Sequence, residues 1–454
     1  MEKNLTTGSV FKNIVVFSLP YFLSYLLQTL YGMADLYIIG QFEGVARTTA
    51  VSIGSQVMHM LTVMIVGLAM GATVSIGQSI GGNDKKMAAR GIGNTITLFM
   101  VVSIVLTVIL VVLVKPITAV MSTPADAVPG TVNYLTICFI GIPFITAYNV
   151  ISAIFRGMGD SKSPMYFIAV ACAANIGLDC LFMGVFHIGP AGAALGTTLS
   201  QAISVIVSLA VILKRKMGVS VSKADFKPQR SVMGKILKIG VPVAFQDGLI
   251  QIAFIVITII ANHRGLNDSA AVGIVEKVMS FLFLIPSSML SAVSALGAQN
   301  IGANKPKRAV ATLRYAAMLA VGFGITVAVT MQFIAEPVVS LFTDASTAEG
   351  AEVVKLGGQY LRGYVWDCIF AGVHFCFSGY FCAAGKSEIS FIHNLCAILL
   401  MRIPGVYLTS KMFPATLFPM GLATASGSLI SVIICIIAFL ILTRKSKRAV
   451  KEVV

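Results

Sequence analysis

Twelve apolar stretches, each about as long as a helix that crosses a bilayer, run through this chain of 454 residues. A hydrocarbon core about 30 Å thick needs about 20 apolar residues in a helix. We therefore predict an all-α integral membrane protein with twelve transmembrane helices. The expected spans are 13–39, 48–80, 88–114, 131–155, 164–186, 191–213, 236–261, 270–300, 309–334, 357–382, 388–410 and 417–443.

The composition and the charge pattern agree with a lipid environment. Hydrophobic residues make up 57% of the chain and charged residues 11%, whereas soluble domains carry about 25% charge. The net charge of +15 could indicate nucleic-acid binding, but most basic residues fall between the apolar stretches. We expect the bilayer as a partner and no nucleic acid.

The basic residues also predict the orientation. With the N-terminus inside, 25 Lys and Arg lie on the cytoplasmic side and six on the opposite side. We therefore expect a multi-pass protein of the bacterial cytoplasmic (inner) membrane with both termini in the cytoplasm.

One phrase occurs twice, 221 positions apart: GQSIGGNDKKMA begins at Gly77, and AQNIGANKPKRA begins at Ala298. Other pairs recur at nearly the same spacing, among them Pro20 with Pro242. The chain therefore contains two copies of one six-helix unit. The glycines and Asn of the phrase suit a tight helix end before a basic loop, so we interpret it as architectural.

This repeat predicts the domain organisation. Residues 1–218 form an N-lobe, 219–235 a cytoplasmic linker, and 236–454 a C-lobe with a basic tail. Six spans return the chain to its starting side, so the two pseudo-symmetric bundles are parallel. Parallel halves are typical of transporters in which access to a site between them alternates. A channel is less well supported, because no filter motif is visible.

Charged groups inside spans are costly and usually functional. Asp35 and Asp179 lie near the outer ends of the first and fifth spans, each about 10 Å deep. Asn175 lies one turn before Asp179 and Tyr31 one turn before Asp35, so each shares a face with its acid. Thr197, near the start of the sixth span, can reach the same level. We predict a polar cluster here.

Two carboxylates in a poorly solvated pocket cannot both stay ionised without a large cost in free energy. The pair should bind a proton or a small cation such as Na⁺, and either event can couple transport to an ion gradient. We expect no further cofactor, and no metal other than Na⁺ at Asp35 and Asp179. The alternative is that the acids are structural hydrogen bonders in wet positions.

The C-lobe does not repeat these acids, because Ile257 matches Asp35 and Gly405 matches Asp179. The Met-rich segment 276–290 can line an adaptable cavity, or it can face lipid or pack in a core. The candidate residues of a substrate cavity are Asp247, Gln251, Glu276, Met279 and Asp367.

Several of these residues have a plainer interpretation. Glu276 precedes Lys277, and an ion pair with a neighbouring helix could neutralise it. Asp367 follows Trp366, the only Trp, in a segment that also suits an interfacial aromatic anchor. Arg402 lies within a span and needs a partner, so we expect a structural salt bridge.

The ordered motifs resemble those of the multidrug and toxic compound extrusion (MATE) family, in its bacterial branch of DinF and MepA type. The resemblance covers nearly the whole chain. It is carried by LPYFLSYLLQTLYGMADLYIIG (19–40), GQSIGGND (77–84), FRGMGDSKSP (155–164), NIGLDCLF (175–182), GPAGAALGTT (189–198) and AQNIGANK (298–305).

The resemblance implies a V-shaped pair of six-helix bundles that exports organic cations in exchange for H⁺ or Na⁺. Asp35, Asn175 and Asp179 match the cation-binding network of this branch, with Tyr31 and Thr197 at its hydroxyl positions. Another branch uses acids in helices seven and ten. Those positions fall here near Ile250 or Gln251 and near Ala371, which favours the N-lobe site.

We therefore expect a secondary multidrug efflux antiporter that can work as a monomer. One alternative is a lipid-linked precursor flippase of the same superfamily, which would need a strongly cationic cavity. Only Lys277 and Arg402 lie well inside the expected spans, because the other basic residues within them, Arg90, Lys238, Arg314 and Arg362, are near span ends, and this argues against the flippase. An enzyme is not expected, because no catalytic metal motif, nucleophile motif or phosphate-binding loop is present.

Overall fold

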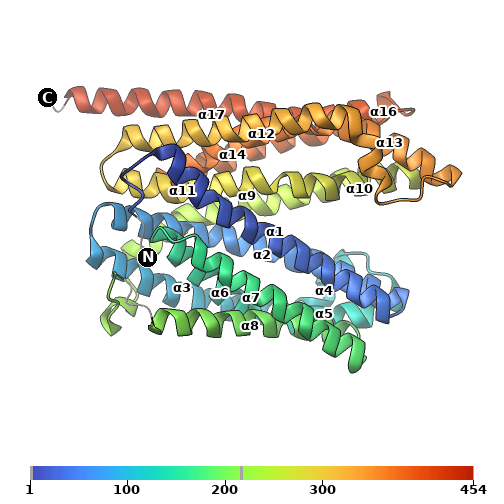
Figure 1. Cartoon of the computed structure of the whole chain (residues 1–454), viewed down its shortest axis with the longest axis horizontal. Helices are drawn as coiled ribbons and strands as arrows, with labels where there is room; N and C mark the ends of the chain where they lie inside the picture. Colours follow the sequence, from blue (N-terminus) through green and yellow to red (C-terminus); the bar gives the residue numbers. More distant parts are fainter. Residues whose placement is uncertain (1–3, 215–217, 453–454) are drawn as a thin grey trace. The chain divides into compact units, whose positions relative to one another are not determined.

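The structure is a computed structural model that describes residues 4–214 and 218–452, with side chains described as far as residue 444. Within these ranges the regular structure is entirely helical (Figure 1). The first half contains α1 (Val10–Phe42), α2 (Val45–Gly81), α3 (Lys85–Val112), α4 (Val114–Val120), η1 (Ala125–Ala127), α5 (Val128–Ile140), α6 (Ile142–Gly157), α7 (Lys162–Asp179), η2 (Cys180–Val185) and α8 (Pro190–Lys214).

The second half follows after η3 (Lys223–Phe226), a short 3₁₀ turn. It contains α9 (Arg230–Asn262), α10 (Leu266–Leu282), α11 (Leu284–Gly302), α12 (Pro306–Ser340), α13 (Ala348–Tyr364), α14 (Asp367–Ala383), α15 (Ser387–Ala397), η4 (Ile398–Arg402), α16 (Ile403–Met412) and α17 (Phe418–Glu452).

The number of membrane spans agrees with the sequence prediction. In the described residues, ten helical segments are long and apolar enough to cross a bilayer. Two further spans are bent pairs: 125–157 bends by 48° at Gly141, and 348–383 bends by 41°. Counting each pair as one span gives twelve, as predicted.

The two halves share local irregularities as well as helix order. Asn83 and Asn304, at equivalent places in the duplicated phrase, both have a left-handed backbone with φ of 56°. Gly159 and Gly385 both have positive φ, of 91° and 70°. Each half also has a π-helical segment within its fifth span, η2 in the first half and η4 in the second. These shared departures from α-helical geometry support the duplication, and π segments are frequent at functional sites.

The chain forms two compact units: Met1–Ala244 with Ala298–Pro306, and Phe245–Gly297 with Lys307–Val454. We call these unit 1 and unit 2. The predicted lobes, 1–218 and 236–454, describe the sequence repeat, and the two units are not divided at the same residues. Unit 1 additionally contains the first part of α9 and the end of α11, because both pack with the first six spans.

The predicted linker is docked on α3 rather than loose. Asn94 is fully buried, and its Nδ2 donates to the carbonyl oxygens of Asp225 (3.0 Å) and Lys227 (3.3 Å). Its Oδ1 accepts from the backbone N–H of Gln229 at 2.7 Å. Gly93 lies against the Asp225 carbonyl, where a side chain would collide. A buried polar side chain on α3 thus supplies the hydrogen bonds that the linker backbone needs.

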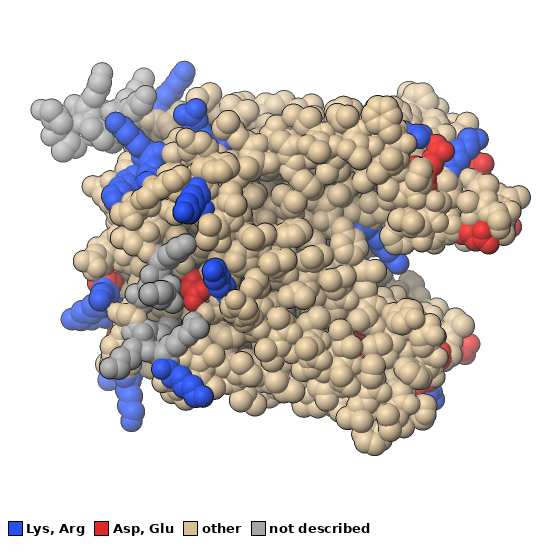
Figure 2. All heavy atoms as spheres, in the orientation of Figure 1, with Lys and Arg blue, Asp and Glu red and all other residues tan. Residues whose placement is uncertain are grey.

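Lys and Arg side chains gather mainly at one end of each unit (Figure 2). In unit 1 this end carries the start of α1, the start of α3 and the end of α8. This is the distribution that the loop charges predicted for the cytoplasmic side.

Candidate cation-binding site

Helices α1, α7 and α8 meet in unit 1, and they bring the predicted polar cluster together. Asp35, Asn175, Asp179 and Thr197 are all buried, with exposed fractions of 4%, 1%, 0% and 9%. Thr197 Oγ1 donates to Asp35 Oδ2 at 3.3 Å. The side chains of Asp179 and Asn175 lie near enough to interact with the Asp35 carboxyl group. The structure therefore places four of the five predicted residues around one point.

The cluster has more polar atoms than hydrogen-bonding partners. Asp35 Oδ1, both carboxyl oxygens of Asp179 and both polar atoms of Asn175 make no regular hydrogen bond within the described residues. No Lys or Arg forms an ion pair with either acid in that part of the chain. Leaving a buried acceptor unpaired costs about 1–3 kcal/mol, and more for a charged group. A proton or a small cation would supply what this site lacks.

Local backbone structure positions the Asp179 side chain. Asn175 and Asp179 are four residues apart on α7 and therefore share a face. The π-helical η2 begins at Cys180, directly after this acid. On α8, Gly196 lies directly against the Asp179 carboxyl group, where a Cβ atom would collide with Oδ1. Gly196 lies in the motif at 189–198, but the sequence alone does not predict its contact with Asp179.

Tyr31, the fifth predicted residue, lies one turn before Asp35 on α1 and within electrostatic range of it. Tyr134 and Cys138 of α5 are also within that range. The sequence analysis missed these two residues, because α5 contributes no charge of its own. Tyr134 does belong to a repeated triplet, NYL at 133–135, which was a usable signal.

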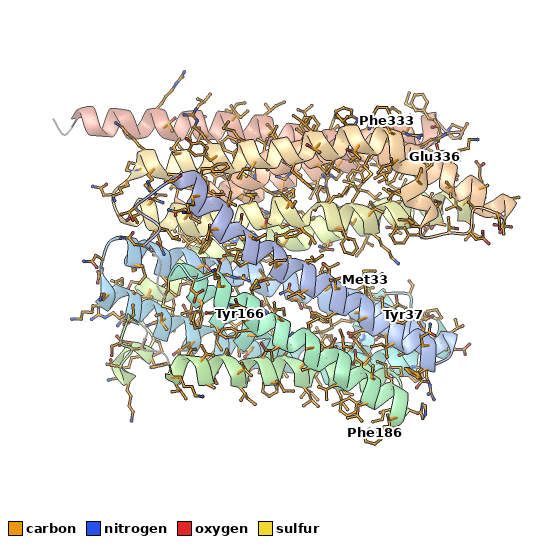
Figure 3. The ribbon with its side chains drawn as sticks, viewed as in Figure 1. Met33, Tyr37, Tyr166, Phe186, Phe333 and Glu336 are labelled. Atoms are coloured by element: carbon orange, nitrogen blue, oxygen red, sulfur yellow. The ribbon has the colours of Figure 1, made fainter. Side chains whose placement is uncertain are left out.

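The opposite side of α1 is exposed. Met33 and Tyr37, with exposed fractions of 46% and 69%, point away from the buried face that carries Asp35 (Figure 3). Residues two positions apart in a helix do not share a face, so Asp35 points inward.

In unit 2, Asp367 and Arg402 form a buried ion pair. Arg402 Nη2 lies 3.0 Å from Asp367 Oδ2 and 2.8 Å from Ser428 Oγ, and Nε donates to the Thr424 carbonyl at 3.2 Å. The salt bridge expected for Arg402 is confirmed. Its guanidinium already compensates the charge of Asp367, which weakens the case for this acid as a ligand of organic cations.

The other predicted cavity residues of unit 2 have different surroundings. Asp247 is half-buried beside Gln246, one turn before the half-buried Gln251. Glu276 Oε2 accepts from Thr258 Oγ1 at 3.3 Å, and Oε1 has no hydrogen-bond partner in the described part. Among the described residues neither acid forms an ion pair, and Lys277 is exposed.

Met279 is 1% exposed and belongs to the hydrophobic core of unit 2. This position agrees with the alternative interpretation of the Met-rich segment, in which its side chains pack in a core. Across the described side chains, no group of three or more His, Cys, Asp or Glu could hold a metal ion.

One charged residue was misplaced by the sequence analysis. Arg156 was counted just beyond the fourth span, but it lies inside α6 and is only 9% exposed. The fourth span was expected to end at residue 155, whereas α6 ends at Gly157, so Arg156 lies in the last turn of the helix and not in the following loop.

The apolar spans and the repeated six-helix plan define a multi-pass membrane transporter, and its unit 1 contains a buried pair of carboxyl groups. One family model, described as MatE, matches both halves, over residues 20–181 and 242–408. Because these matches cover most of the chain, the protein belongs to the MatE family. The family resemblance drawn from the motifs is confirmed.

Relatives with similar sequences carry names that refer to multidrug resistance or multidrug export. The probable multidrug resistance protein YpnP of Bacillus subtilis (strain 168) is 29% identical over 425 residues, with 93% of each chain covered. The multidrug export protein MepA of Staphylococcus aureus (strain MSSA476) is 26% identical over 412 residues, with 90% of this chain and 89% of MepA covered.

Solved structures show the same fold. An outward-facing multidrug resistance MATE transporter of the MOP superfamily superposes with a TM-score of 0.89 at 22% identity, over 99% of this chain and 98% of that one. A MOP superfamily transporter from Pyrococcus furiosus also superposes at 0.89, with 23% identity and 98% of each chain covered.

Proposed function

We propose that this protein is a multidrug efflux antiporter that exports small organic cations in exchange for H⁺ or Na⁺ by alternating access. The observation that carries the proposal is the buried pair of carboxyl groups, Asp35 and Asp179, with most of their oxygens unpartnered. In the C-lobe the equivalent positions hold Ile257 and Gly405, so coupling is assigned to the N-lobe.

The site can convert cation binding into a change of helix packing. With a proton or Na⁺ bound, the two carboxyl groups are held together, and α1 is tied to α7 and α8. Without that cation the like charges repel at short range in a poorly solvated environment. The repulsion favours separation of α1 from α7. The hydrogen bond from Thr197 to Asp35 then breaks unless Thr197 moves together with Asp35.

The substrate side of the proposal rests on Asp247 and Glu276. Both are half-buried, and neither is neutralised by Lys or Arg among the described residues. Such carboxylates can attract a lipophilic organic cation, which loses less hydration energy than an inorganic ion on leaving water. The names of YpnP, a probable multidrug resistance protein, and MepA, a multidrug export protein, support drugs as the substrates.

The basic end of each unit then faces the cytoplasm of a bacterial cell, and both termini lie there. The single chain carries both the coupling acids and the substrate acids, so we expect a monomer to be sufficient.

The test uses purified protein in proteoliposomes loaded with ethidium. A pH gradient and a Na⁺ gradient are imposed separately on wild type, Asp35→Asn and Asp179→Asn. Asp126→Asn, an exposed loop acid, is the matched control. We expect one gradient to drive export in wild type and the control, and both site variants to lose that response.

Gradient-driven export that survives in both Asp35→Asn and Asp179→Asn would overturn the site assignment. No ethidium movement under either gradient would overturn the multidrug function and favour the flippase.

A further inference from the structure

Arg156 and Arg402 are the buried arginines of the described chain, with exposed fractions of 9% and 8%. Arg402 is compensated by Asp367 at 3.0 Å. Arg156 forms no ion pair and donates no hydrogen bond to any described residue; its guanidinium carbon lies 4.4 Å from the centre of the Tyr21 ring. A ring face offsets only part of the cost of burying a cation. Arg156 is therefore an undercompensated buried charge.

The guanidinium lines a small cavity inside unit 1, between α1, α2 and α6. The polar groups on its wall come from Tyr21, Thr73, Asn149 and Arg156, and the remaining wall is apolar. No acidic side chain of the described residues lines it. Thr73 Oγ1 is occupied as a donor to the Ala153 carbonyl at 3.1 Å. Asn149 Nδ2 donates one hydrogen to the Ile145 carbonyl at 2.8 Å and keeps a second one.

The size of the cavity restricts what it can hold. The space open to the centre of a water-sized sphere is about 10 Å³, roughly what one water molecule needs. A phosphate or a carboxylate-bearing molecule does not fit such a volume. Chloride is only slightly larger than water and carries the one negative charge that Arg156 lacks.

We propose that this cavity is a binding site for a small monovalent anion of chloride size, held by the Arg156 guanidinium and the free amide hydrogen of Asn149. The anion would compensate the buried arginine and join α1, α2 and α6 near Pro20. The site is separate from the carboxyl cluster, because Tyr21 and Asp35 are 14 residues apart on α1, about 21 Å of helix.

The first test measures thermal unfolding of the full chain in detergent, in NaCl and in sodium gluconate of equal ionic strength. Gluconate is too large for the cavity. We expect chloride, at concentrations well above its Kd, to raise the Tm by about 2–4 °C in wild type. Arg156→Gln should remove this difference.

Asn149→Asp keeps the test decisive if Arg156→Gln folds poorly. The new carboxylate would compensate Arg156 internally, so the folded variant should no longer respond to chloride. The matched control is Asn394→Asp in unit 2. Asn394 is equally buried (5% against 6%), and its Nδ2 also donates to the carbonyl four residues earlier, that of Ser390 at 3.0 Å. This control should keep the chloride response.

Crystals grown in bromide give the direct readout. We expect an anomalous peak beside the Arg156 guanidinium in wild type and none in Asn149→Asp. A cavity that holds only water, seen as no peak together with no chloride dependence of the wild-type Tm, would overturn the proposal. A chloride response that persists equally in Asn149→Asp would overturn it as well.

Discussion

Gly196 of α8 lies directly against the carboxyl group of Asp179, so that no larger residue can occupy its position without displacing the acid. This contact lets α8 approach α7 where Thr197 reaches Asp35. The geometry of the carboxyl cluster therefore depends on an uncharged residue as much as on the acids themselves.

Gly196→Ala should impair coupling without changing any charge. The added methyl group must push Asp179 away from Asp35, at a cost of about 1–3 kcal/mol in stability. We expect gradient-driven export to fall by about tenfold or more, which corresponds to about 1.4 kcal/mol in the coupled step. Gly177→Ala, in the same helix as Asp179 but facing open space, is the control and should transport normally. Equal activity of the two variants would contradict the proposed role of Gly196.

Loss of one partner from the Asp367–Arg402 pair should be severe. Arg402→Ala leaves a buried carboxylate and several acceptors without donors, and we expect about 3–5 kcal/mol of destabilisation. Removing both charges in Arg402→Met/Asp367→Leu should restore most of that stability. Thermal unfolding in detergent distinguishes these outcomes. If the double variant is as unstable as Arg402→Ala, the pair has a role beyond mutual compensation.

The substrate acids can be tested separately from the coupling acids. Asp247→Asn and Glu276→Gln remove charges that no described cation compensates, so lipophilic monocations should bind about tenfold more weakly, a loss of about 1.4 kcal/mol. The choice of driving ion should stay unchanged. Glu336→Gln is the control, because Glu336 (labelled in Figure 3) is partly exposed and forms an ion pair with Arg362 at 2.9 Å. Unaltered binding in both test variants would remove these acids from the substrate cavity.

The linker should detach from α3 in Asn94→Ala. This change removes three hydrogen bonds to residues 225–229 from a fully buried position, and we expect a loss of about 1–3 kcal/mol. Trypsin cleavage after Lys223 should become faster, while cleavage after Lys307 serves as the internal reference. Unchanged relative rates would mean that other contacts hold the linker.

The pH dependence of the linker turn follows from Asp225. Its carboxylate accepts from the Ser222 hydroxyl at 2.7 Å and from the Ser222 N–H at 2.8 Å, and these bonds hold the pKa of Asp225 below its usual 3.8. A depressed pKa contributes stability above the unfolded value, and that stability is lost as the pH falls through the folded value. Hydrogen exchange at residues 222–226 should therefore be protected equally between about pH 5 and 8. Protection that declines within this range would contradict the assignment.

Much of the cation site was accessible from spacing alone. Asp35 and Asp179 stand out because a carboxyl group in an apolar span is rare, and Asn175 and Tyr31 follow from a helical period. Helical spacing reports which residues share a face, but it does not report which helix that face meets. For this reason Tyr134, Cys138 and Gly196 were not assigned to the site, and Arg156 was taken for a loop residue.

By itself, the sequence determined the number of spans, the duplication and which acids lie within apolar spans. These features follow from segment length, repeated motifs and the cost of charge in lipid, which are all properties of one stretch of chain. Tertiary structure decided which buried charges are compensated. Arg402 forms an ion pair with Asp367, which is 35 positions away in the sequence. Among the described residues, the charge of Arg156 is offset only by the Tyr21 ring. Met279 lies in a hydrophobic core. Compensation depends on distances between helices, and only packing sets those distances.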